Sequence, residues 1–165
     1  MRVVSWEAVN RKLTLEARKF LKEAYGFELA IPVKVNGRMK STFGVFKHAR
    51  GRKESVCIEL GKNYILHNEW KTIYETLIHE CIHYWCFEMD RPYRDGDAFF
   101  ENELRKHGSH STGTVSYKGK VVQYACTADG CSKIYQKKKR YPRDGAGYRS
   151  GCCRAPIKNI GFKMV

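Results

Sequence analysis

Two histidines and a glutamate lie at a spacing that can hold and use a metal ion. His79, Glu80 and His83 form the pattern His-Glu-x-x-His within an apolar, helix-like run. A helix places residues i and i+4 on one face, so both imidazoles can reach the same ion. The glutamate beside the first histidine can then hold a metal-bound water. Because this spacing is tied to one kind of chemistry, it predicts a zinc-dependent hydrolase, in the first place a peptidase.

A catalytic zinc ion commonly takes three protein ligands and one water, so a third ligand is expected further along the chain. We predict Asp95, which follows His83 beyond a proline-containing turn, where the chain can fold back over the helix. Glu88 is disfavoured, because five residues after His83 on the same helix it points elsewhere. The remaining alternatives are Asp97, Glu101 and His107.

In this interpretation Glu80 is the general base, which takes a proton from the zinc-bound water and passes it to the leaving amine. Zinc would lower the pKa of that water toward about 7 and polarise the scissile carbonyl. An aspartate ligand would weaken this effect, because its negative charge raises the pKa of the water relative to a three-histidine site. Tyr93 and Arg94 lie near Asp95 in the sequence and are the candidates for stabilising an oxyanion.

The hydrophobic pattern predicts the elements that must position these residues. An amphipathic helix is expected over residues 10–25, ending at Gly26, and the helix that carries the histidines over residues 68–89. A third helix is expected over residues 97–107. Between the first two helices, apolar runs at 29–35, 41–47 and 55–60 predict three strands joined by short turns. His48 follows the second of these runs and is interpreted as a surface or structural residue.

Length and composition predict one domain with a small appendage, since the chain has 165 residues of which 42% are hydrophobic. No apolar run is long enough for a transmembrane helix, so no membrane partner is expected. The N-terminus has no signal-peptide apolar region, which leads us to expect a cytoplasmic location, or a nuclear one in a eukaryote. In that setting the seven cysteines indicate metal binding or buried thiols rather than disulfides. We expect a monomer.

The cysteines near the C-terminus have the spacing of a second metal site. Cys126 and Cys131 are separated by four residues, and Cys152 and Cys153 follow about twenty residues later. The pattern resembles a zinc ribbon and predicts a structural zinc ion on these four residues. Adjacent cysteines chelate one ion awkwardly, so His110 or an empty fourth position are alternatives. The other cysteines, Cys57, Cys81 and Cys86, are interpreted as buried thiols.

The positive charge of the chain is concentrated in the same C-terminal region. The net charge is +14, and residues 114–165 hold twelve basic but only two acidic side chains. A basic run there is flanked by tyrosines, which can stack on unpaired bases while the cations bind phosphates. We therefore predict that this run contacts DNA that is single-stranded or otherwise unpaired. Its basic residues are Lys137, Lys138, Lys139, Arg140 and Arg143.

The order of these motifs resembles the SprT-like family of zinc metallopeptidases, which includes the Spartan DNA-dependent proteases. The resemblance covers about residues 5–155 and rests on the strand at 31–36, the run Ile58-Glu59-Leu60, His79-Glu80-x-x-His83, Asp95-Gly96-x-x-Phe99 and the cysteine-bearing ribbon. It implies an α+β, zincin-like minimal metalloprotease core: an N-terminal helix, a three-stranded antiparallel sheet, the His-Glu-x-x-His helix and a further helix. A small β zinc-ribbon-like appendage follows. We expect the metallopeptidase domain over residues 1–113 and the basic ribbon domain over residues 114–165.

This sequence departs from the family pattern at two positions. The third zinc ligand of the family is usually a histidine in a His-Gly-x-x-Phe/Trp element, and Asp95 stands at that place here. We interpret Asp95 as a substitute ligand, and the alternative is a weakened or inactive site. In the ribbon, Ser150 stands where the family has a cysteine, and Cys152 would then shift to supply the fourth ligand.

The resemblance implies a peptidase that cleaves proteins bound or crosslinked to DNA, with the ribbon bringing it to the strand. The expected cofactors are one catalytic zinc ion and one structural zinc ion. One alternative is a nucleic-acid-binding protein whose metal site is vestigial or regulatory. Another is a zinc hydrolase that acts on a non-peptide bond, since the motif itself does not specify an amide substrate.

Overall fold

The structure is a computed structural model that describes residues 5–40, 42–109 and 119–165. The chain divides into two compact units, and the residues described are 5–40 and 42–109 in the first and 119–165 in the second. The predicted domain boundary at 113/114 and His110 lie outside the described residues.

The first unit begins with helix α1, Trp6–Tyr25. The Ser5 hydroxyl caps its start by accepting a hydrogen bond from the Ala8 N–H at 3.3 Å, and Gly26 ends it in the left-handed conformation. The predicted helix and its stop are confirmed, although the helix begins four residues earlier than expected. One face is buried in the core, through Leu13, Ala17, Phe20 and Leu21.

Three strands form the sheet of this unit: β1 (Val33–Asn36), β2 (Gly44–His48) and β3 (Ser55–Gly61). The sheet has the order β1-β3-β2, with β2 antiparallel and β1 parallel to β3. The α+β class is confirmed, but the expectation of a fully antiparallel sheet is wrong at the β1–β3 pairing.

The position of β3 explains this difference. Its side chains Ile58 and Leu60 are fully buried, and such a strand belongs at the centre of a sheet rather than at its edge. The chain after β1 therefore does not turn back as a hairpin but crosses to the far edge, where β2 begins. Asn36, the last residue of β1, also bonds to the central strand through its side chain, donating from Nδ2 to Glu59 Oε2 at 2.6 Å.

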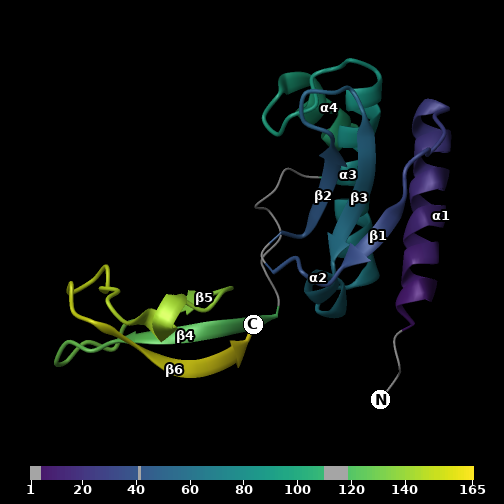
Figure 1. Ribbon diagram of the computed structural model, residues 1–165. Coiled ribbons are helices and arrows are strands. Elements are labelled where there is room, and N and C mark those ends of the chain that lie inside the picture. Colours follow the sequence, from purple (N-terminus) through teal and green to yellow (C-terminus); the bar gives the residue numbers. More distant parts are fainter. Residues whose placement is uncertain (1–4, 41, 110–118) are drawn as a thin grey trace. The chain divides into compact units, whose positions relative to one another are not determined.

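Three helices follow the sheet: α2 (Lys62–Leu66), α3 (Trp70–Glu88) and α4 (Ala98–Lys106). The sequence pattern predicted α3 and α4 within two residues at each end, and missed the short α2. Helix α3 packs against β2 and β3, and α1 packs against β1 and α3 (Figure 1). The buried thiols of Cys57, Cys81 and Cys86 lie in this unit, as predicted.

The second unit is a three-stranded antiparallel sheet of β4 (Lys120–Cys126), β5 (Ile134–Lys137) and β6 (Ile157–Met164), in the order β5-β4-β6 (Figure 1). A short 3-10 helix, η1 (Pro142–Gly145), lies between β5 and β6. The fully buried Tyr124 anchors this segment, because its hydroxyl accepts a hydrogen bond from the Tyr141 N–H at 2.9 Å. Among all the described residues, no helix has the length and apolar character needed to cross a bilayer.

Candidate functional site

Helix α3 presents His79, Glu80 and His83 toward one cleft. Ten of its residues are buried, which holds the helix against the sheet and leaves these polar side chains in an apolar setting. His79 and Glu80 are each only 4% exposed. Buried polar groups are costly unless they are paired, so their presence here marks a site rather than a packing surface.

The loop after α3 brings Asp95 to the two histidines. Its Oδ1 lies 3.1 Å from His79 Nε2 and 3.5 Å from His83 Nε2, and the two Nε2 atoms are 3.0 Å apart. The loop turns back because Asp90 adopts a positive φ of 52°, while the Arg91 N–H bonds to the Cys86 carbonyl at 2.8 Å. The structure thus brings together the three residues that we predicted as ligands.

The other ligand candidates have different contacts. Asp97 accepts a hydrogen bond from the Arg94 N–H at 2.9 Å, and Glu101 accepts one from the Gly96 N–H at 2.9 Å. Both carboxylates therefore shape the loop that carries Asp95. His107 packs edge-on against the rings of Phe20 and Tyr25. Among the described residues, the group that could hold an ion here consists of His79, His83 and Asp95.

Hydrogen bonds fix the ring of His83 in an orientation suited to a ligand. Its Nδ1 donates to the Tyr93 carbonyl, which leaves Nε2 directed at Asp95. Burial alone would lower the pKa of His83, but the hydrogen bond with Asp95 and the nearby Glu80 raise it. The pKa of Asp95 is lowered, chiefly by its hydrogen bond with His83. Asp95 is therefore a carboxylate, the form that a metal ion binds.

Glu80 does not join the ligand cluster but contacts the neighbouring strand. Its Oε2 accepts a hydrogen bond from the Phe46 N–H of β2 at 2.7 Å. Burial raises the pKa of Glu80 to about 7, and His83 and the Phe46 hydrogen bond oppose this rise. A carboxylate with a pKa near neutrality can both accept and return a proton.

The cleft around these residues has a volume of about 360 Å³. Strand β2 and the loop after α3 both contribute to its lining, and the oxyanion candidates Tyr93 and Arg94 are among the lining residues. His48 also lines it and stacks on Phe87 with a ring separation of 4.7 Å. The interpretation of His48 as a surface or structural residue missed its place in the cleft, because that place depends on the pairing of β2 with β3.

The ligand distances fit a small tetrahedral ion. Bonds of about 2.0–2.1 Å from a tetrahedral zinc ion place its nitrogen and oxygen ligands about 3.3 Å apart. The observed separations of 3.0, 3.1 and 3.5 Å are close to that value. Two imidazoles and a carboxylate are also a donor set that zinc accepts.

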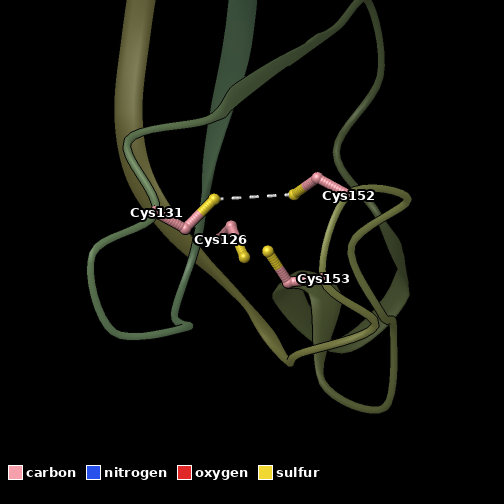
Figure 2. A group of neighbouring side chains, drawn as sticks. All are labelled: Cys126, Cys131, Cys152 and Cys153. Carbon is pink, nitrogen blue, oxygen red and sulfur yellow. Dashed lines mark hydrogen bonds between the residues drawn. The ribbon is translucent and has the colours of Figure 1, made fainter.

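The second unit holds the cysteine cluster, where two turns meet. The sulfur atoms of Cys126, Cys131, Cys152 and Cys153 point into one shared space (Figure 2) and all lie within 4.8 Å of one another. The dashed line in Figure 2 joins the sulfurs of Cys131 and Cys152, which lie 3.6 Å apart. Tetrahedral zinc–sulfur bonds of about 2.3 Å require about 3.8 Å between sulfurs, so this cluster also fits a zinc-sized ion.

Ser150 supports the adjacent pair of cysteines. Its buried hydroxyl lies 3.2 Å from the Cys126 sulfur and accepts a hydrogen bond from the Cys153 N–H at 3.4 Å. The Tyr135 hydroxyl accepts a hydrogen bond from the Cys152 N–H at 3.0 Å. A separate hydrogen bond between the Cys152 thiol and the Tyr135 side chain is the main reason that the pKa of this thiol falls to about 6. The shift of the fourth cysteine to position 152 is thus accommodated by the turn.

The predicted nucleic-acid-binding residues lie on the surface of the ribbon unit. Lys137 ends β5, and Lys138, Lys139, Arg140 and Arg143 follow it, all of them exposed. The Arg140 guanidinium lies 3.3 Å from Asp144 and 5.4 Å from the centre of the Phe162 ring. Next to this run is a cavity of about 180 Å³ whose lining includes Tyr135, Lys137, Tyr141 and Arg149.

A core of helices and a small sheet, with two histidines one turn apart on its central helix, defines a zincin-like fold, here with a zinc-ribbon-like appendage. The chain belongs to the SprT-like family, whose family model matches residues 11–115. A protein named "Protein SprT-like" from Oceanobacillus iheyensis is 27% identical over 128 residues, which cover 76% of this chain and 79% of that protein. Another "Protein SprT-like", from Bacillus velezensis, is 29% identical over 129 residues, or 76% of this chain and 80% of its own.

Proposed function

We propose that this protein is a zinc-dependent metallopeptidase of the SprT-like type that cleaves proteins on or near DNA. One observation carries the proposal: the buried carboxylate of Glu80 lies in the same cleft as the converging His79, His83 and Asp95 ligand atoms. A buried base beside a metal-type cluster is the arrangement needed for hydrolysis.

Each side chain of the cleft has a separate role in this proposal. His79, His83 and Asp95 hold the ion, and the Tyr93 carbonyl fixes the ring of His83. A bound zinc ion would polarise the scissile carbonyl and make water more acidic. Glu80 takes a proton from the attacking water and gives it to the amine nitrogen as the C–N bond breaks, so the carboxylate is regenerated.

The ribbon supports a role at DNA. Its exposed cations can neutralise phosphates, and the cavity beside them is lined by Tyr135 and Tyr141, aromatic residues of the kind on which unpaired bases stack. Single-stranded DNA is the ligand that this combination favours, because its bases are free to stack. The test of the whole proposal is cleavage of a DNA-bound protein by the zinc-loaded chain, with and without single-stranded DNA.

Replacing Lys137, Lys138 and Lys139 together with alanine is expected to weaken single-stranded DNA binding by about tenfold or more at low salt. Each lost phosphate contact removes about 0.7 from the slope of log K against log salt, so the slope should fall by about 2. Fluorescence anisotropy over a salt series measures both quantities. The control replaces three exposed cations of the first unit, Arg18, Lys19 and Lys71. Equal losses in the two triple variants would contradict the assignment of the ribbon.

Replacing Cys131 with serine is expected to remove the zinc ion from the ribbon and leave the one near His79. Mass spectrometry under native conditions should then find two ions in the wild type and one in the variant. Cys81→Ala is the control, because that buried thiol lies outside both clusters. One ion in the wild type would show that the cysteine cluster does not hold zinc, and two ions in Cys131→Ser would show that Cys131 is not a required ligand.

A second function is favoured by the identity of Asp95. An aspartate at the position where the SprT-like pattern has a histidine is compatible with a nucleic-acid-binding protein whose metal site is vestigial or regulatory. In that case DNA binding would survive and zinc-dependent cleavage would be missing in the zinc-loaded wild type.

A further inference from the structure

Strand β2 approaches the Glu80 side chain at a glycine. A Cβ atom built on Gly44 would lie 2.9 Å from both Cγ and Oε1 of Glu80 and 2.9 Å from Cγ2 of Thr76. Contacts this short force something to move. The φ of Gly44 is not positive, so its backbone conformation is one that any residue adopts. The glycine is therefore needed for space and not for conformational freedom.

The surroundings of Gly44 cannot easily yield. Gly44 pairs with Leu60 of the central strand, and the Gly61 N–H bonds to the Phe43 carbonyl at 2.9 Å, so β2 is held on its inner side. On the other side, the Thr76 hydroxyl lies 2.7 Å from the hydroxyl of the buried Tyr64. The side chain left to move is Glu80.

Two residues along the strand, the Phe46 N–H holds Oε2 of the same carboxylate at 2.7 Å. β2 thus positions the Glu80 carboxylate in two ways. The Phe46 N–H donates a hydrogen bond to Oε2, and the absence of a side chain at Gly44 leaves space for Oε1. Gly44 and Glu80 both line the cleft.

We infer that Gly44 is a positioning residue for Glu80, and that the edge of β2 sets where the carboxylate meets the reacting water. With Oε2 engaged by Phe46, Oε1 over Gly44 is the oxygen that receives the proton. The catalytic part of this inference rests on the proposed peptidase function. The steric part does not, because it concerns only the packing of β2 against α3.

The kinetic test introduces Gly44→Ala into a Thr76→Ser background, where the clashing methyl of residue 76 is gone and its hydroxyl remains. Gly44→Ala is expected to lower kcat by about 10²-fold, since a displacement of about 1 Å at a reacting group has that effect. KM and zinc content should change much less than kcat, because the added methyl group would contact Glu80 and not a zinc ligand. Gly37→Ala is the matched control, since Gly37 also has an ordinary φ and its Cβ would meet only Lys62 Cδ at 3.8 Å. An unchanged kcat, or a fall that Gly37→Ala shares, would overturn the inference.

A thermal unfolding cycle tests the steric part without any cleavage. In the Thr76→Ser background, Gly44→Ala should lower Tm by about 5 °C. When Glu80→Ala has already removed Cγ and the carboxylate, the same Gly44→Ala substitution should lower Tm much less. Equal shifts with and without the Glu80 side chain would overturn the inference, whatever the activity. If the two Tm shifts are non-additive but the zinc-loaded chain cleaves no substrate, the steric contact between Gly44 and Glu80 is supported and the proposed peptidase function is contradicted.

Discussion

Glu80→Gln is expected to lower kcat/KM for peptide cleavage by about 10²–10⁴-fold, the usual contribution of a positioned general base. Glutamine has nearly the same shape, and its amide oxygen can still accept the hydrogen bond from the Phe46 N–H. What it loses is the ability to take a proton from water. The fall corresponds to about 3–5 kcal/mol of transition-state stabilisation.

The measurement is cleavage of a DNA-bound protein substrate together with zinc analysis of the same preparation. Glu75→Gln provides the control, because Glu75 lies on the same helix and does not line the cleft. Loss of activity in Glu80→Gln together with loss of zinc would point to a ligand role and contradict the base assignment. Full activity of the variant would exclude Glu80 from the reaction.

Asp95→Ala is expected to weaken zinc binding at the histidine site by more than about 100-fold. Removing a residue that only hydrogen-bonds to a metal ligand costs about 10–100-fold, and loss of a ligand itself should cost more. The substitution removes a carboxylate oxygen that lies 3.1 Å from His79 Nε2 and 3.5 Å from His83 Nε2. Two neutral imidazoles would remain, and the charge that offsets the dication would be lost. Competition with a chelator of known affinity measures the change.

Two further variants separate ligation from charge. Asp95→His restores the family pattern and should keep zinc. Because a neutral ligand leaves the ion a stronger Lewis acid, the pKa of the zinc-bound water should fall, and the rise of activity with pH should begin at a lower pH than in the wild type. Asp97→Asn removes a neighbouring charge but keeps an oxygen for the Arg94 N–H, so its zinc affinity should match the wild type. If Asp95→Ala bound zinc as tightly as Asp97→Asn, Asp95 would not be the third ligand.

The histidine helix could be predicted because its signal is local. Apolar residues along residues 70–88 repeat with the period of a helix, and the two histidines share one face by the same period. The pairing of the strands could not be read in this way. Local patterns find β1, β2 and β3, but the burial of β3 between the other two depends on contacts that are distant in sequence.

The candidate sites show the same division. Asp95 could be predicted as the third ligand from its position after the helix, but the sequence could not exclude Asp97 and Glu101. The structure separates them, because those two carboxylates accept hydrogen bonds from backbone N–H groups of the loop. Gly44 and His48 gave no sequence signal, since both reach the cleft only through the register of β2. The sequence alone left open whether the adjacent residues Cys152 and Cys153 could bind the same ion. In the structure, the Ser150 hydroxyl bonds to the Cys153 N–H in their turn, and both sulfurs point into the cluster.

Anomalous diffraction at the zinc absorption edge, from crystals of the zinc-loaded chain, would locate the ion of the histidine site. We expect a peak bound by His79 Nε2, His83 Nε2 and an Asp95 carboxylate oxygen, with Glu80 beside it but not bound to it, and a separate peak at the cysteine cluster. A loaded crystal with no peak at the histidines, or with a peak there that Asp95 does not contact, would contradict the assignment of these ligands.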